Sequence, residues 1–454
     1  MSADSTLKRR LGLLRGVVRN IVTRPLPNGP ISRDIIKVHG LARARLGPGV
    51  ICGVTRVGLE RFNALADEIF DDPPINGRGT RYATYTYELF GITLREFAER
   101  QPGNIAKADV ILLQDAIANW FADRAEARTV FVPCVLSRWP SPRFSVGPIP
   151  FIFLDEVRQT EFYPSADTLD GVARIEVDKF LERIRAAGAS WLAVVEIENC
   201  DGERALEIAD IAVDLAIAAL QLVIPHPGTN NMSTLATRRG PNLQWTLSMS
   251  KSSPTVSFAD RDPGLALGTG TLAQIVGQAA PVIQAIGNRI RAFVSGSFKL
   301  PRLEQSWSDA AYWLHQGLAE PLGTVAVPKL ETAIEVLLGA ESSKKSEARI
   351  VNAVAAFYGL HCNDPINPET QLTVGAFVKE LVTDRSRILH GTWPTLASRL
   401  DMARESLESV AAFLLQASAL ALEQYLASDA PIDKMEPFLH WANAYRLRTV
   451  SGNQ

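Results

Sequence analysis

Residues 395–427, TLASRLDMARESLESVAAFLLQASALALEQYLA, decide the fold class of the C-terminal part of the chain. Apolar side chains recur in this stretch at alternating intervals of four and three residues. They are Leu396, Leu400, Ala403, Leu407, Val410, Leu414, Ala417 and Ala421. This spacing keeps one apolar stripe on the same side of a helix over many turns, as in the seam of a helical bundle. We therefore predict a long helix that packs against other helices.

Further helical patterns precede this helix, and strand patterns end at about Leu272. The helical patterns lie at 272–294, apart from its proline, and near 308–320, 328–339, 346–358 and 371–390. Because Gly, Ser and Pro interrupt regular structure, the segment 295–307 marks a boundary. We predict an all-α helical bundle over 305–428, with a helix and linker at 271–304 before it and a tail at 429–454 after it.

The first part of the chain mixes helix and strand patterns. A helical repeat covers 57–71, and β-rich runs follow. The runs are 128–139, 144–155, 191–199 and 243–260. We predict that 1–270 is an α+β region of one or two subdomains, so that the whole chain is α+β at its N-terminal side and all-α at its C-terminal side.

Two helical stretches bear on membranes and RNA. Residues 205–224 are long and apolar, but Glu207, Asp210 and Asp214 share one face, which predicts an amphipathic core helix and no membrane span. Residues 5–24 combine an apolar stripe with many basic side chains. Such a helix can lie on a membrane, bind RNA or act as a transit peptide, or it can dock on the protein with its arginines in solvent. We favour docking.

Composition limits the remaining classes. The 454 residues carry a net charge of −2, so no overall field would draw the chain to nucleic acid or anionic lipid. The four cysteines and six histidines are scattered, which predicts a reducing cytoplasm and no structural metal. GTGTLA at 268–273 lacks the preceding strand of a dinucleotide fingerprint, and no GxSxG elbow occurs. We expect no cofactor.

The stretch DRSRILHG at 384–391 places charged groups on an apolar helix face. Arg385 falls within the arc of apolar side chains around it, and His390 follows five residues later, beside Ser386. A guanidinium on such a face needs an acid or an anion. One interpretation is that Arg385 holds a phosphate while His390 moves a proton. The other is that Arg385 pairs with Glu331 or Glu335 while His390 ends the helix.

The segment LVTDRSRILHGTW at 381–393 resembles the R-x4-6-H signature of HEPN domains, and most closely the Apea-like branch, in which this helix tends to read RSxIxHG. The upstream AIEVLLG at 333–339 is also similar to that branch. The resemblance covers about 305–428. It implies a metal-independent endoribonuclease that works as a symmetric homodimer through the bundle.

The resemblance also implies roles for individual residues. Arg385 would bind the scissile phosphate, and His390 would be the general base or acid for attack by the ribose 2′-OH. Ser386 and Arg387 would contact the RNA substrate. The products would carry 2′,3′-cyclic phosphate or 3′-phosphate and 5′-hydroxyl ends.

A biological role follows from the same resemblance. We expect a cytoplasmic, toxin-like effector in anti-phage defence, in which 1–270 binds an unknown trigger and regulates the bundle. The alternative is a non-catalytic HEPN module that only dimerises or binds a nucleotide or RNA.

Overall fold

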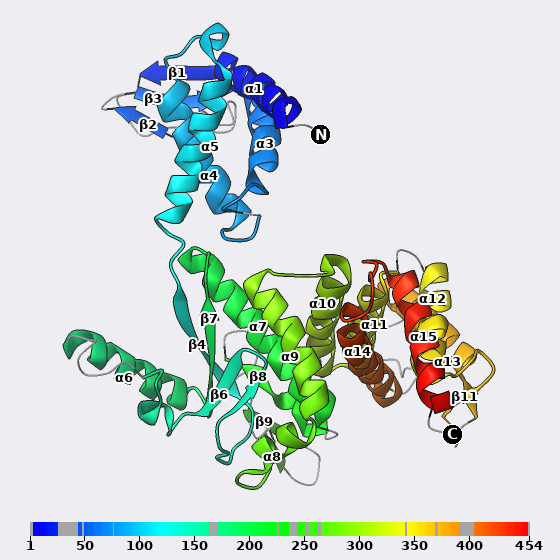
Figure 1. Cartoon of the computed structure of the whole chain (residues 1–454). Helices are drawn as coiled ribbons and strands as arrows, with labels where there is room; N and C mark the ends of the chain where they lie inside the picture. The colour runs from blue at the N-terminus through cyan, green and yellow to red at the C-terminus, as the bar shows by residue number, and fades with distance from the viewer. Residues whose placement is uncertain are drawn as a thin grey trace. The chain divides into compact units, whose positions relative to one another are not determined.

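The computed structural model describes most of the chain (Figure 1). The described residues are 3–25, 44–47, 50–75, 77–163, 171–224, 227–235, 243–249, 254–260, 265–340, 343–367, 371–390 and 404–452. They form two compact units, which we describe separately. Unit 1 consists of Met1–Arg128 and Ile197–Glu207, and unit 2 of Thr129–Glu196 and Ile208–Gln454.

Unit 1 packs helices against a small antiparallel sheet of strand order β1-β3-β2. Its principal elements are α1 (Ala3–Arg19), β1 (Ile21–Pro25), β2 (Ala44–Gly47), β3 (Val50–Val54), α3 (Arg56–Phe70), α4 (Tyr82–Phe97) and α5 (Lys107–Ala122). The side chain of Thr55 caps α3 by accepting a hydrogen bond from the Gly58 N–H. The core lies between the helices and includes Phe62 and Leu89, both buried.

The basic N-terminal helix is docked within unit 1, as we favoured. Leu14 and Val17 of α1 are fully buried, and α1 packs on α3 and α5. Arg10 forms an ion pair with Asp72, and Arg15 donates two hydrogen bonds to the carbonyl oxygen of Ile105. The helix predicted at 5–24 ends earlier, at Arg19, because Ile21–Pro25 form strand β1, which pairs with β3. β-Branched side chains favour a strand at this point.

Unit 2 begins with a five-stranded sheet of order β5-β6-β7-β4-β8. The elements up to the bundle are β4 (Arg128–Val135), β5 (Phe144–Val146), β6 (Ile149–Phe153), α6 (Gly171–Ala186), β7 (Trp191–Ile197), α7 (Gly202–Val223), β8 (Ser233–Thr234), β9 (Leu243–Met249), β10 (Pro254–Asp260), α8 (Thr271–Gln278) and α9 (Ala280–Ser295). Strands β9 and β10 form a separate antiparallel pair. Strands are therefore present in the runs expected at 128–139, 144–155, 191–199 and 243–260.

Helix α7 is more deeply buried than we predicted for an amphipathic helix with one polar face. Asp214, which we placed on a polar face, is fully buried. Its Oδ1 lies 3.6 Å from Nε2 of the buried His315, and Nδ1 of His315 lies 2.9 Å from Oε1 of Gln221. The acidic face is thus partly inside the protein, where the buried His315 of α10 lies beside Asp214.

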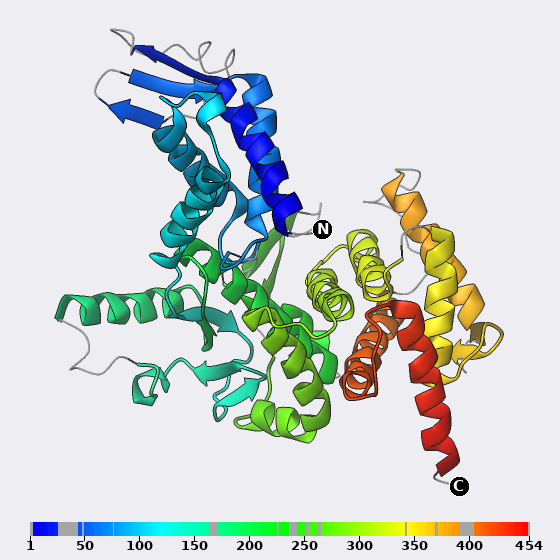
Figure 2. The ribbon, with the colours of Figure 1, turned by 45° about the horizontal axis from the view of Figure 1, so that its top comes forward.

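The C-terminal part of unit 2 is helical (Figures 1 and 2). Its elements are α10 (Pro301–Leu318), α11 (Gly323–Leu338), α12 (Ser343–Tyr358), a short pair of strands β11 (Pro365–Asn367) and β12 (Leu372–Thr373), α13 (Val374–Leu389), α14 (Arg404–Leu426) and α15 (Met435–Gly452). This agrees with the expected general layout, in which most strands precede residue 271 and helices follow, but β11 and β12 add one strand pair to the bundle predicted as all-α. The first residues of the expected long helix, 395–403, lie outside the described residues.

The predicted boundary at 271–304 falls inside unit 2. Helix α9 packs against α10 and α14, and the buried Arg289 on α9 is paired with Glu423 at 2.8 Å and lies 3.5 Å from Glu304. The expected linker 295–307 is helical from Pro301 onward. The compact units divide instead at Arg128 and around Ile197–Glu207, and the finer division of the chain stays a prediction.

The segment predicted as a tail contains helix α15. It lies beside α12 in both views (Figures 1 and 2). Phe438 is buried against Tyr425 and Phe357, with ring centroids 5.3 and 6.1 Å apart. The C-terminal segment therefore adds to the core of the bundle.

Among the described residues, one helix is long and apolar enough to cross a membrane by length and composition, namely α14. Leu407, Leu414 and Leu415 on this helix are buried in the bundle. A core helix meets the same criteria, so this weak candidate agrees with the prediction of no membrane span.

Candidate active site on helix α13

Helix α13 carries three of the four predicted site residues, and the fourth, His390, is the C-cap residue directly after it. Thr373 caps its N-terminus, where the hydroxyl accepts a hydrogen bond from the Ala376 N–H at 3.2 Å. Phe377 and Leu381 are buried, and the helix packs on α11 and α12. The last helical hydrogen bond joins the His390 N–H to the Ser386 carbonyl oxygen at 3.0 Å. Gly391, which follows His390 in the sequence, lies outside the described residues.

Arg385 is bound to two acids of α11. Its Nη2 lies 2.9 Å from Oε2 of Glu335, its Nη1 donates to Oε1 of the same carboxylate at 3.2 Å, and its Nε lies 3.5 Å from Oε2 of Glu331. The contact with Glu335 is a bidentate pair, the strongest geometry available to a guanidinium. About 25% of the Arg385 side chain remains exposed. The pairing alternative from the sequence is therefore the arrangement present in this chain.

Glu331 is an unusual partner because it is completely buried. Burial raises its pKa to about 8, against the opposing effect of Arg385, and the nearby Glu335 and Asp384 raise it further. In the described part of the chain, neither of its carboxylate oxygens has a hydrogen-bond partner. At neutral pH Glu331 is thus mainly protonated, and Glu335 supplies the negative charge that balances Arg385.

The remaining predicted residues lie toward solvent. Arg387 and His390 are exposed and Ser386 is half-buried. His390 lies about 7.5 Å along the helix axis from Arg385 and roughly 140° around it. The structure therefore brings Arg385 to the α11 acids and leaves His390 at the exposed end of α13.

One acid beside the site was missed. Asp384, next to Arg385, is 1% exposed. Its spacing was a usable signal, because Phe377, Leu381 and Asp384 are separated by four and three residues and so share one face. Among the described residues, no group of three or more His, Cys, Asp or Glu side chains could hold a metal ion.

Comparisons of this chain with protein-family models, with curated proteins and with solved structures find no match. A function must therefore be inferred from the residues of α11 and α13 themselves.

Proposed function

We propose that this protein is a metal-independent endoribonuclease of the HEPN type. The observation that carries the proposal is that Glu335 holds Arg385 in a fixed orientation near the end of α13, while His390, directly after the helix, is exposed. A fixed guanidinium can bind a phosphate with little loss of side-chain entropy, since its orientation is already set.

The chemistry follows from the two side-chain types. Imidazole exchanges protons near neutral pH, so His390 accepts the proton of the ribose 2′-OH or protonates the leaving 5′-oxygen. Arg385 stabilises the charge on the phosphate oxygens. The 2′-oxygen forms the new bond to phosphorus as the bond to the 5′-oxygen breaks. This leaves a 2′,3′-cyclic phosphate and a 5′-hydroxyl, and attack of water on the cyclic phosphate, with cleavage of its bond to the 2′-oxygen, would give the 3′-phosphate.

The active form would be a homodimer. Within one chain, Arg385 is half-buried against α11 while His390 is exposed. Two copies that pair through the ends of their α13 helices would supply two arginines and two histidines to one cleft. A scissile phosphate would share Arg385 with Glu335 or displace that carboxylate.

The test is cleavage of end-labelled tRNA and single-stranded RNA by the purified full-length protein in EDTA. We expect the wild type to cut and His390→Ala to lose activity at least about a hundredfold, as for loss of a general acid–base group. His361→Ala is the matched control, because His361 is also an exposed histidine of unit 2. Equal cleavage by wild type and His390→Ala would contradict the assignment.

The biological proposal is a cytoplasmic, toxin-like effector in anti-phage defence, whose N-terminal region detects a trigger. Expression with and without phage infection checks this proposal. We expect infection to bring growth arrest in cells with the wild type and no arrest in cells with His390→Ala. Unimpeded growth of infected wild-type cells across a broad phage panel would count against it.

A second candidate is a non-catalytic module that dimerises or binds RNA or a nucleotide. The bidentate contact between Arg385 and Glu335 favours it, because such a contact also serves to join α11 to α13. Arg385→Lys separates the candidates, since it keeps the charge and loses the fork. A ribonuclease would lose most of its activity while remaining dimeric, whereas a module would keep its binding.

A further inference from the structure

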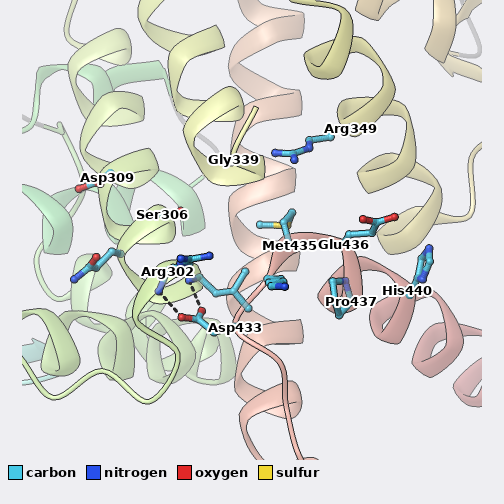
Figure 3. A pocket seen from close by; sticks show the side chains of 13 residues that line it. Arg302, Ser306, Asp309, Gly339, Arg349, Asp433, Met435, Glu436, Pro437 and His440 are labelled. Atoms are coloured by element: carbon cyan, nitrogen blue, oxygen red, sulfur yellow. Dashed lines mark hydrogen bonds between the residues drawn. The ribbon is translucent and has the colours of Figure 1, made fainter. Parts of the chain in front are cut away.

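A large cleft in unit 2 lies apart from the four predicted site residues, none of which lines it. It has a volume of about 1080 Å³ and lies between the first turns of α10, the end of α11, α12 and the start of α15 (Figure 3). A second hollow of about 550 Å³ shares Arg349 and His440 with it. Small-molecule sites usually measure about 300–1,000 Å³, so the cleft has room for a nucleotide-sized ligand.

Three cations from different parts of the chain line this cleft. They are Arg302 on α10, Arg349 on α12 and Lys434 just before α15. Figure 3 shows Arg302 and Arg349 entering it from different sides. Arg349 donates one hydrogen bond, to the Leu338 carbonyl oxygen at 2.8 Å. Across the described ranges, none of the three cations forms an ion pair with a carboxylate.

Three acids also line the cleft and equal its cations in number, but among the described residues none of them forms an ion pair with those cations. The carboxylate of Asp433 accepts hydrogen bonds from the backbone N–H groups of Arg302 and Leu303 at 2.9 and 3.0 Å, so it serves to cap α10. Asp309 lies at one side, away from Arg349, and Glu436 lies in the first turn of α15 (Figure 3). Helix α15 also begins here, and its N-terminus adds partial positive charge.

We propose that this cleft binds the phosphate groups of a small, multiply charged ligand, of the class of nucleoside polyphosphates and pyrophosphate. Two guanidinium forks and an ammonium group, drawn from three elements, suit several phosphate oxygens at once. The proposal does not depend on the ribonuclease activity, because none of the four predicted site residues lines the cleft.

The test is isothermal titration of the full-length protein with ATP, with pyrophosphate and with a ten-nucleotide RNA that lacks terminal phosphates. The variant is Arg302→Gln/Lys434→Gln, since both side chains are exposed and the backbone N–H bound by Asp433 is kept. Arg448→Gln is the control, as an exposed cation of α15 outside the cleft.

We expect ATP and pyrophosphate to bind wild type and Arg448→Gln equally, and to bind the double variant at least about tenfold more weakly. Absence of binding by both ligands, or equal binding by the double variant, would overturn the proposal. The RNA could instead bind the wild type, with binding that is lost in the double variant and is not competed by pyrophosphate. This result would assign the cleft to an RNA backbone and would also overturn the proposal.

Discussion

Arg385 lies between the charged Glu335 and the largely neutral Glu331. Removing the guanidinium is therefore expected to lower the free energy of unfolding. Arg385→Ala leaves Glu335, which is 11% exposed, without its counterion. Removing one partner of a buried ion pair typically costs about 3–5 kcal/mol. We expect a loss of roughly 3 kcal/mol in the free energy of unfolding, measured by urea denaturation.

The double variant Arg385→Ala/Glu335→Gln is the control for that prediction. If the cost comes from the unpaired carboxylate, the double variant regains part of the stability, with a coupling energy of about 1–3 kcal/mol. Strictly additive losses would show that Arg385 contributes through packing alone.

Glu331 makes the stability of the bundle depend on pH. Because its pKa is raised from its usual 4.5 to about 8, the folded protein binds this proton more tightly than the unfolded chain does. Its stabilising contribution is therefore complete below about pH 4.5 and is lost as the pH rises through about 8. We expect Glu331→Gln to match the wild type near pH 4 and to exceed it in unfolding free energy by a margin that grows up to about pH 8.

The measurement is urea unfolding of both proteins at several pH values, with Glu436→Gln as a control on an exposed acid. Parallel pH curves for wild type and Glu331→Gln would mean that this carboxyl is ionised in the folded protein at neutral pH.

At the scale of elements, helix α15 is an integral part of the bundle. We expect Phe438→Ala to lower the unfolding free energy by about 3–5 kcal/mol, the usual cost of a cavity left by a buried phenylalanine. Leu447→Ala on the same helix, at a side chain that is 51% exposed, should change it by less than about 0.5 kcal/mol. Thermal or urea unfolding of the two variants checks this difference, and similar losses would contradict the burial of α15 through Phe438.

Local patterns predicted most helices but not which of them pack together. The stripe of α13 and the acids of α11 were visible in the sequence, so the possible partners of Arg385 were correctly reduced to Glu331 and Glu335. The alignment of α11 with α13, which selects Glu335 as the bidentate partner, depends on tertiary packing. Helix α15 was missed because its apolar and polar side chains are not clearly separated onto two faces. Pro437 is no obstacle to the helix, since it lies in the first turn, where proline is tolerated.

At the scale of the whole molecule, unit 1 is completed by residues far along the chain. Asp201 accepts a hydrogen bond from the Thr80 hydroxyl, and its backbone N–H donates to the Gly79 carbonyl oxygen at 2.7 Å. Its Oδ1 also accepts from the Arg204 N–H at 2.8 Å at the start of α7. No local sequence pattern predicts such contacts, because they join segments more than a hundred residues apart.

We expect Asp201→Ala to loosen unit 1 selectively. Loss of a helix cap costs about 0.5–2 kcal/mol, so amide hydrogen exchange in α4 and α5 should accelerate by roughly twofold to thirtyfold. Exchange in α10 and α11 should stay unchanged. Asp155→Ala, at an exposed ion pair with Arg185, is the control. Uniform acceleration across both units would show that they unfold together.

The discontinuity of unit 1 also sets an order of events during synthesis. The ribosome must make the strands β4 to β7 before the segment Ile197–Glu207 emerges to complete unit 1. At about 5–20 residues per second, the first 128 residues wait several seconds for that segment. The N-terminal unit is thus expected to mature late on the nascent chain, while the bundle that carries Arg385 and His390 is only beginning to be translated.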